Sequence, residues 1–443
     1  MMPLDIFLTA YDPSDLPGSS LDPLGFDRGY DFLAEKILPG LTNVANRPRY
    51  FGMLCAGAAL SKDIFHHSSR EQYNERLERV KRFERLWALA NALATLRDGQ
   101  PEETLSGLRG VTYATARAQE IVRKGENPVS ADYRLLSRQV QYGGVGMYGA
   151  VAERIRLMDR QRLTLTPDLG ARLAEAFLEQ TKLPKEIEKA TADDSSLDVS
   201  TLSSWGRSAH IRERVGKDEA RCLKDALHLD PVRSRMAFVL KRVPCSSEES
   251  ELTRLERIHR ALRGDTDNRD LEEATRAILG YERAYQLSLL AMERMLWLCR
   301  QDTAGSVDRE TMQTDVVLND VEAQLPKAVS EFVAALDSST TEAFLKDLGR
   351  LDDVVDFLKK SSEGCQAKGG LIQEIMDRHA EVQRGKFDRG RRKLPWMEYV
   401  KGRIALTMTR VGGMRSEVTL PSQIQPHPYR LAAADALIEA SES

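Results

Sequence analysis

The stretch SSREQYNERLERVKRFERLWALANALATLRDG, residues 68–99, carries the clearest structural signal in this chain of 443 residues. Ser68, followed three residues later by Glu71, is a capping-box sequence that starts a helix. Apolar residues then recur every three or four positions until Asp98-Gly99 interrupts the pattern. These residues are Tyr73, Leu77, Val80, Phe83 and Trp87. We therefore expect one long amphipathic helix here.

The same spacing recurs along most of the chain. A second long helix is expected from Asp270 to about Arg300, with Glu and Arg on its other faces. Strand-like alternation is nearly absent, so the sequence predicts a mainly α, multi-helical fold. Further helices are expected at residues 27–37, 111–124, 131–141, 171–180, 218–227, 248–263, 316–336, 341–360, 371–382, 396–411 and 429–440.

Three stretches interrupt this helical pattern and indicate a division into parts. Residues 1–26 are rich in proline and glycine, which favours an extended N-terminal arm. The polar residues 181–214 are the expected linker or boundary between an N-terminal helical domain, 27–180, and a C-terminal helical domain, 215–443. The third stretch, residues 383–395, is basic and contains glycine.

Composition limits the classes of function. With 64 basic and 67 acidic residues the formal charge is only −3, so any contact with nucleic acid must be local. The five cysteines are widely spaced and form no Cys-x-x-Cys pair, which argues against a disulfide framework and a zinc site. The N-terminus lacks a signal-peptide pattern, and the longest uncharged apolar stretch, residues 50–60, is too short to cross a bilayer. We expect a cytoplasmic protein without membrane contact.

Residues 132–180 have an order of elements similar to that of winged-helix modules. A short helix and a glycine-rich turn precede a second helix, a short basic hairpin and, after Pro167, a third helix. In such modules one helix enters the major groove and the hairpin touches the backbone. The alternative is a helical subdomain with a solvated, charged corner. The candidate nucleic-acid contacts here are Arg154, Arg156, Arg160 and Arg162.

The densest basic segment is residues 378–415, with eleven Lys and Arg against three Asp and Glu, a net charge of +8. Such a density attracts phosphates, and the interleaved Phe387, Trp396 and Tyr399 are suited to stacking on bases. A solvated loop or an acidic protein partner is the alternative interpretation. The candidate nucleic-acid contacts here are Arg384, Lys386, Arg389, Arg391, Arg392 and Lys393.

No pattern in the sequence indicates catalysis or a cofactor. Residues 144–149 match Gly-x-Gly-x-x-Gly, but a helical pattern rather than a strand precedes them, and no P-loop is present. His66-His67 has no ligand partner at metal-binding spacing, and residues 265–270 depart from a calcium loop at its fifth and sixth positions. We expect no catalytic residue, no cofactor and no metal site. The alternative is a metal-dependent nuclease whose carboxylates, such as those at residues 347–356, converge only in the fold.

The segment from Leu38 to Phe51 combines a turn with two arginines beside a proline. Pro48 favours an extended Arg47, so that Arg47 and Arg49 point along one side. A guanidinium fork suits a phosphate or a carboxylate of a partner. The alternative is that both arginines pair with Asp or Glu inside the domain and fix the arm.

These residues also carry a resemblance to a known group of proteins. Leu38-Pro39-Gly40-Leu41-Thr42-Asn43 with Arg47-Pro48-Arg49-Tyr50-Phe51, followed by Tyr142-Gly143-Gly144-Val145-Gly146, resembles uncharacterised bacterial proteins of phage-defence gene clusters. The resemblance covers about residues 25–170 and implies a setting, defence against foreign DNA alongside enzyme subunits, but no chemistry. Cys55-Ala56-Gly57 stands in the region where the resemblance leads us to expect a tryptophan.

The sequence thus leads us to expect a non-catalytic subunit of a bacterial defence complex. Its expected partners are DNA, taken to be duplex, and other subunits that include an ATPase or a nuclease. A pure protein scaffold, whose arm at residues 1–26 clasps a neighbour without DNA contact, is a further alternative.

Overall fold

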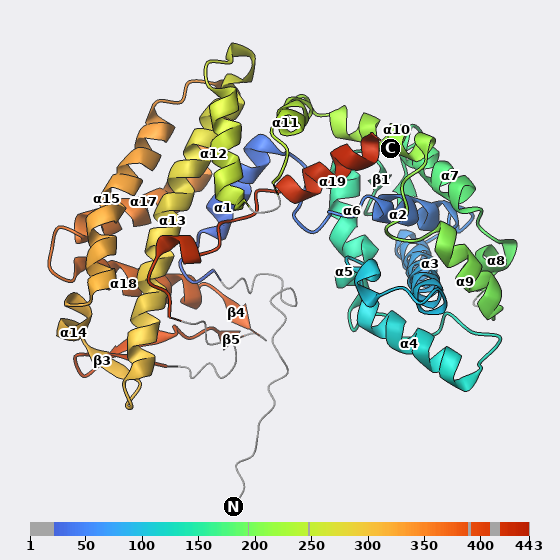
Figure 1. The fold of residues 1–443 in the computed structure, drawn as a ribbon, viewed down its shortest axis with the longest axis horizontal. Coiled ribbons are helices and arrows are strands. Elements are labelled where there is room, and N and C mark those ends of the chain that lie inside the picture. Colours follow the sequence, from blue (N-terminus) through green and yellow to red (C-terminus); the bar gives the residue numbers. More distant parts are fainter. Residues whose placement is uncertain (1–21, 194, 247–248, 389–390, 408–416, 443) are drawn as a thin grey trace, which may run out of the picture. The chain divides into compact units, whose positions relative to one another are not determined.

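The chain is mainly α-helical in the computed structural model (Figure 1), as the sequence predicts. It forms two compact units, which we treat separately. Unit 1 comprises the described residues up to Ile37 together with Val243–Tyr429, and unit 2 comprises Leu38–Arg242 and the residues from Arg430. The structure describes residues 22–193, 195–246, 249–388, 391–407 and 417–442.

This division differs from the one expected from the sequence. The stretch 181–214, predicted to be a linker, contains two helices of unit 2, because Ile187, Leu202 and Trp205 supply buried apolar positions within its polar sequence. The chain instead passes between the units after residues 37, 242 and 429. The first described helix therefore belongs to unit 1 and the last one to unit 2.

Unit 2 is built around one long helix and one short hairpin. The hairpin pairs two antiparallel strands, with Met158 opposite Leu165. The helices are α2 (Arg49–Ala59), α3 (Ser69–Arg97), α4 (Val111–Lys124), α5 (Gln139–Tyr142), α6 (Gly144–Arg154), α7 (Leu169–Thr181), α8 (Lys185–Asp193), α9 (Val199–Ser208), α10 (Lys217–His228), α11 (Pro231–Arg242) and α19 (Leu431–Ser441), and the strands are β1 (Met158–Asp159) and β2 (Thr164–Leu165).

Helix α3 is the long amphipathic helix that residues 68–99 predict. The Ser68 hydroxyl accepts a 3.4 Å hydrogen bond from the backbone N–H of Glu71, as an N-cap residue does. The helix packs against α2, α4 and α9. Trp87 is fully buried in this core, where its indole Nε1 donates a 2.6 Å hydrogen bond to the carbonyl of Ala209.

Unit 1 is a helical bundle with two small sheets, whose strands come from residues 306–308 and 387–406. Its three-stranded antiparallel sheet has the order β3-β7-β6, and β4 pairs with β5 in a separate hairpin. The helices are α1 (Asp27–Ile37), α12 (Glu251–Leu262), α13 (Arg269–Gln301), α14 (Arg309–Gln313), α15 (Val316–Asp337), α16 (Glu342–Leu345), α17 (Asp352–Gly364) and α18 (Gly370–Arg384), and the strands are β3 (Ser306–Asp308), β4 (Phe387–Asp388), β5 (Arg391–Arg392), β6 (Met397–Val400) and β7 (Arg403–Leu406).

Helices α13 and α15 lie side by side in unit 1 (Figure 1). Gly280 makes their close approach feasible, because a Cβ atom at this position would lie only 2.8 Å from the Cα atom of Phe332 in α15. Phe332 is buried, and its ring packs edge-on against Tyr281 with the ring centroids 5.5 Å apart. The missing side chain at residue 280 thus sets the distance between the two longest helices of this unit.

Of the expected helices, one is wrong and two form only in part. Residues 396–407 form β6 and β7, joined by a tight turn in which Lys401 and Gly402 have positive φ angles of 50° and 80°; residues 408–411 lie outside the described part. The predicted helix 341–360 is broken at Asp347, whose φ of 61° cannot continue a helix. Of the predicted helix 131–141, only α5 at its end is helical.

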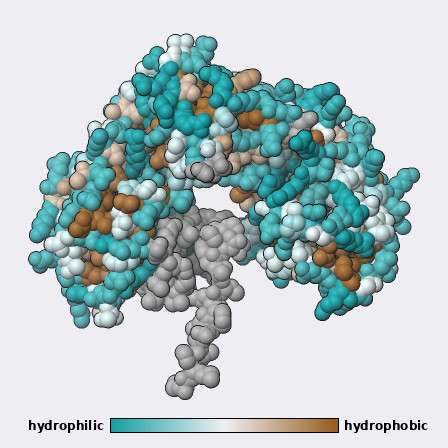
Figure 2. All heavy atoms as spheres, viewed as in Figure 1, coloured by the Kyte–Doolittle hydropathy of each residue, from teal (hydrophilic) through white to brown (hydrophobic). Residues whose placement is uncertain are grey.

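The surface shown in Figure 2 is mostly hydrophilic, and hydrophobic side chains appear there in separate small areas. Within the described ranges, no helix is both long and apolar enough to cross a membrane. All five cysteines are free thiols, and Cys55, Cys222 and Cys299 are buried.

Candidate nucleic-acid interface

The arginine hairpin, which we define as residues 154–165 of unit 2, presents all four arginines expected there to solvent. Arg154 ends α6, Arg156 precedes β1, and Arg160 and Arg162 lie in the turn between β1 and β2. Each of the four is exposed, and the Arg162 side chain is 80% exposed although it lies 3.7 Å from Asp159. A basic hairpin between two helices is therefore present where the sequence predicts it, whereas a winged-helix module is not confirmed.

The backbone of the arginine hairpin is held firmly beneath these side chains. Leu157, Met158 and Leu163 are buried. The hydroxyl of Thr166 donates a 2.7 Å hydrogen bond to the carbonyl of Arg156, and its backbone N–H donates to the carbonyl of Leu157 at 3.0 Å. The charged groups therefore extend from a fixed support, which lowers the entropy lost when they bind a partner.

The glycine-rich motif at residues 143–146 serves the junction between α5 and α6. The buried carboxylate of Glu84 accepts a 2.7 Å hydrogen bond from the backbone N–H of Gly144, at the start of α6, and a 2.9 Å hydrogen bond from Gln139 Nε2. A Cβ atom at Gly146 would lie 2.0 Å from the carbonyl oxygen of Gln141. A protein carboxylate thus already occupies the helix N-terminus that a nucleotide phosphate would need.

Burial raises the pKa of Glu84 above its ordinary value, although the hydrogen bonds from Gln139 and Gly144 oppose this shift. The carboxyl group is enclosed by helices rather than placed in a cleft. Its position fits a role in closing the α5–α6 junction.

Arg49 occupies an internal position, and the role expected for it as a partner contact is corrected. Its Nη1 atom donates hydrogen bonds to Glu219 at 2.6 Å and to Gln180 at 2.9 Å, and its Nη2 atom donates to the carbonyl of Ser208 at 3.0 Å. The Phe177 ring lies 4.9 Å from the guanidinium carbon. The structure therefore favours the alternative in which this arginine pairs with an acid inside its own domain.

Burial raises the pKa of Glu219 to about 7, and the positive charge of Arg49 opposes this shift. Because the geometry is that of a short ion pair, we take Arg49 to be what keeps this buried carboxyl ionised.

Arg47 is half-buried and lies along Gly107. A Cβ atom added at Gly107 would lie 2.3 Å from Arg47 Nε, so the missing side chain makes room for the arginine. A backbone hydrogen bond from Arg47 to the Tyr148 hydroxyl lowers the pKa of Tyr148, although burial raises it overall. These contacts fix the segment before α2.

In unit 1, helix α18 anchors the start of the described chain. Arg378 donates hydrogen bonds to the carbonyl of Leu24 at 2.8 Å and to both carboxylate oxygens of Asp353 at 2.9 and 2.6 Å. Lys386 donates to the carbonyl of Asp22. Burial lowers the pKa of Lys386 below its ordinary value, and the residue is committed to this anchor, which corrects its expected role as a nucleic-acid contact.

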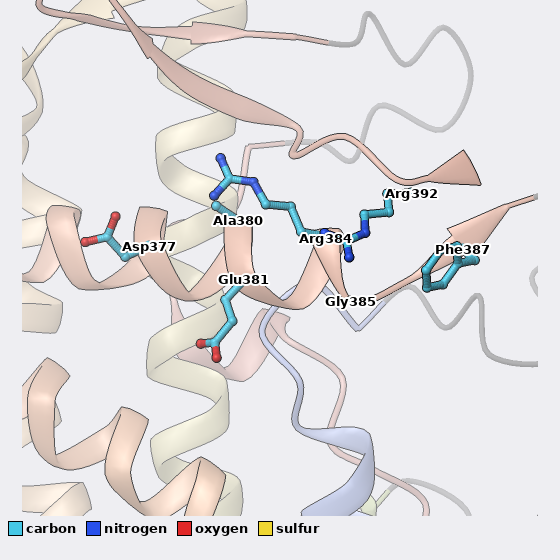
Figure 3. A pocket seen from close by; sticks show the side chains of 7 residues that line it. All are labelled: Asp377, Ala380, Glu381, Arg384, Gly385, Phe387 and Arg392. Carbon is cyan, nitrogen blue, oxygen red and sulfur yellow. The ribbon is translucent and has the colours of Figure 1, made fainter. Parts of the chain in front are cut away.

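A hollow of about 470 Å³ lies between the last turns of α18 and the β4–β5 hairpin (Figure 3). In that view Arg384 leaves α18 and Arg392 leaves the hairpin on the same side of the helix, whereas the Glu381 carboxylate projects to the opposite side. Both arginines are exposed, and the Phe387 side chain is 62% exposed. The hollow is lined by Asp377, Ala380, Glu381, Arg384, Gly385, Phe387 and Arg392.

The remaining residues of the predicted basic segment differ in their exposure and in how far the structure describes them. Lys393 follows β5 and is half-buried. Arg389 lies outside the described residues, and Arg391 is described only as part of the backbone of β5. Tyr399 is exposed on β6. The Trp396 backbone N–H donates a hydrogen bond to His379, and the Trp396 ring packs edge-on against the same histidine of α18.

Among the carboxylates at residues 347–356, that of Asp353 has a structural partner. Asp353 forms the ion pair with Arg378, and Asp347 precedes the short 3-10 helix Leu348–Leu351. Over the described part of the chain, no group of three His, Cys, Asp or Glu residues is placed to hold a metal ion.

Sequence reasoning found Arg384, Arg392 and Phe387 but did not bring them together around one hollow. The available signal was the spacing of Asp377, Ala380 and Arg384, which places them on one face of a helix. The hairpin that brings Arg392 back to this face could not be predicted, because two-residue strands are too short to show an alternating pattern in the sequence. Comparison of the chain with models of protein families, with curated proteins and with solved structures finds no match.

Proposed function

We propose that this chain is a non-catalytic DNA-contacting subunit, and that the arginine hairpin of unit 2 is its main contact with duplex DNA. The observation that carries the proposal is the exposure of Arg154, Arg156, Arg160 and Arg162 on one firmly supported hairpin. In this proposal the hairpin contacts the phosphate backbone, as the wing of a winged-helix module does.

Electrostatics favour a local contact of this kind. The chain as a whole carries a formal charge of only −3, so it has no general attraction for DNA. Guanidinium groups bind phosphates with two parallel hydrogen bonds, and each neutralised phosphate releases condensed counterions. A hairpin with four exposed arginines therefore provides affinity that depends strongly on salt.

The biological setting that we propose is a bacterial complex for defence against foreign DNA, in which an ATPase or a nuclease subunit supplies the chemistry. This part is supported by the resemblance of residues 38–51 and 142–146 to proteins of phage-defence gene clusters. Co-purification from the native operon tests it, and the expected result is recovery of such an enzyme subunit with the chain. Recovery of the chain alone under mild conditions would contradict it.

The DNA contact is tested by changing Arg154, Arg156, Arg160 and Arg162 together to Ala. We expect affinity for a duplex to fall at least tenfold, and the slope of log K against log salt to flatten by up to about 4, because each duplex phosphate contributes about 0.9. The measurement is fluorescence anisotropy of a labelled duplex over a salt series.

A matched control removes four exposed positive charges from helices of the same unit, at Arg97, Arg123, Arg221 and Lys224. The control has the same net charge as the hairpin variant, so general electrostatics would weaken both equally. Equal binding by the two variants, or wild-type binding by the hairpin variant, would overturn the assignment of the arginine hairpin.

A further inference from the structure

The hollow beside the β4–β5 hairpin of unit 1 combines positive charge with an exposed aromatic ring (Figure 3). Over the described residues, neither Arg384 nor Arg392 takes part in an ion pair or a side-chain hydrogen bond. The nearby acids have partners, since Glu381 lies 3.5 Å from Arg378 Nη1 and Asp377 accepts a 2.8 Å hydrogen bond from Gln373. The neutral Gln373 amide leaves the Asp377 carboxylate charged, so what the hollow offers an anion is the two arginines, which have no ion-pair partner among the described residues.

Phe387 adds a feature that binding of a simple anion does not need. Its side chain is 62% exposed at the rim of the hollow, although transfer of a phenyl ring out of water is favourable. An aromatic face beside arginines is the arrangement on which proteins stack unpaired bases. A ligand with one planar ring and one phosphate would use both kinds of group.

The α18 side of the hollow is held in place by buried contacts. Asp377, Ala380 and Arg384 share one face of α18, and the neighbouring face carries the anchoring residues Arg378 and His379. His379 is fully buried, and its two ring nitrogens are hydrogen-bonded to the carbonyl of Pro23 at 3.0 Å and to the backbone N–H of Trp396 at 2.8 Å. The last turns of α18 are thereby fixed on both sides before a ligand binds.

We propose that this hollow binds one unpaired nucleotide of a DNA single strand, with the base stacked on Phe387 and a phosphate bound by Arg384 and Arg392. A volume of about 470 Å³ lies within the usual range for pockets of small ligands. A base inside a duplex has both faces covered by its neighbours and cannot stack on the ring. The site differs from the arginine hairpin both in its unit and in the form of DNA it takes; it shares with the proposed function only the assumption that DNA is the partner.

The test compares a labelled single strand with a duplex of the same sequence by fluorescence anisotropy, using the full chain. Phe387→Leu should weaken binding of the single strand at least about fivefold, because stacking of one base on an aromatic ring is worth about 1–3 kcal/mol. Phe387→Tyr keeps the ring and should bind like the wild type. Binding of the duplex should change less than twofold in both variants.

The arginines and a matched control complete the design. Arg384→Ala with Arg392→Ala should weaken binding of the single strand and flatten its salt slope by about 0.7, the contribution of the one phosphate that the two arginines bind. Phe65→Leu makes the same chemical change at a side chain of unit 2 that is 78% exposed, and it should leave binding unchanged. A thermal melt checks that the variants stay folded.

Wild-type affinity of Phe387→Leu for the single strand would overturn the inference, and so would an equal loss for single strand and duplex. Absence of any binding of a single strand by the wild type, as expected if an acidic protein segment is the true ligand, would also overturn it. Failure of the proposed function looks different: duplex binding is then absent or insensitive to the arginine hairpin, while the Phe387-dependent binding of the single strand remains.

Discussion

Arg49 and Glu219 form a buried ion pair across unit 2, with 2.6 Å between Arg49 Nη1 and Glu219 Oε2 and with side chains that are 2% and 0% exposed. The two residues lie on α2 and α10 and are separated by 170 positions in the sequence. The pair therefore joins the start of the unit to a distant helix.

Arg49→Ala should lower the free energy of unfolding of unit 2 by about 3–5 kcal/mol, because it leaves Glu219 buried without a counter-charge. Arg49→Met combined with Glu219→Leu should recover most of this loss, since apolar side chains of similar size need no ion pair. Urea denaturation with peptide-resolved hydrogen exchange of α2 and α10 measures both variants. A loss below about 1 kcal/mol in Arg49→Ala would contradict the architectural role.

The pH dependence gives a second check on the same pair. In Arg49→Ala the pKa of Glu219, already raised by burial, should rise further, because its positive neighbour is gone. A carboxyl whose pKa is higher in the folded than in the unfolded state contributes stability at low pH and loses it as pH rises. The variant should therefore be closest to the wild type near pH 5 and furthest from it near pH 8.

Glu84 should be required for the junction of α5 and α6 rather than for any nucleotide. Glu84→Leu leaves two buried donors, Gln139 Nε2 and the Gly144 N–H, without their acceptor, and should cost about 2 kcal/mol or more. Glu84→Gln keeps one acceptor oxygen and should cost less. Hydrogen exchange at the start of α6 measures the effect, and equal exchange in the two variants would argue against this role.

Much of the helical fold could be predicted from the sequence, because its helices are amphipathic and have recognisable start and stop signals. The predicted helices at residues 27–37 and 111–124 agree to the residue with α1 and α4. The prediction failed at residues 396–411, where Met397, Val400 and Ile404 are spaced by three and four and so fit a helix. The turn at Lys401-Gly402, which needs two positive φ angles, was the overlooked strand signal.

The candidate sites were less predictable, since exposure depends on tertiary partners. The four arginines of the arginine hairpin are exposed as expected, because their segment is short and local. Arg49 looked equally available in the sequence, but its partner is a distant acid within an ordinary helical pattern. Lys386 likewise binds the carbonyl of Asp22, and no local pattern announces that contact.

Gly280→Ala should destabilise unit 1 by about 1–3 kcal/mol, although alanine is the better helix former. The added Cβ would lie 2.8 Å from the Cα atom of Phe332, and backbone cannot move aside as a flexible side chain can. Gly149→Ala in α6 is the matched control, because the atoms nearest to its Cβ would belong to the flexible Arg160 side chain, at 3.4 Å or more. The control should be neutral or slightly stabilising in urea denaturation. Two variants of equal stability would disprove the idea that Gly280 sets the spacing of α13 and α15.

His379 should make unit 1 sensitive to mild acid. Burial lowers the pKa of His379 to about 4, and its Nε2 atom must stay unprotonated to accept the hydrogen bond from Trp396. Because the pKa is lower in the folded state than in the unfolded one, stability is fully present above about pH 6.5 and is lost as pH falls toward 4, by up to about 3 kcal/mol.

His379→Gln removes the titrating group, so its stability should be lower than that of the wild type at pH 7.5 but should fall less between pH 6.5 and 4.5. The melting temperature of unit 1, followed over this range by calorimetry, gives the comparison. His259→Gln is a suitable control, since the pKa of that half-buried histidine of α12 is also lowered by burial but the residue lies outside the α18 anchor. If the acid-induced loss of stability were the same in His379→Gln and in the wild type, the anchor formed by Pro23, His379 and Trp396 would not be its source.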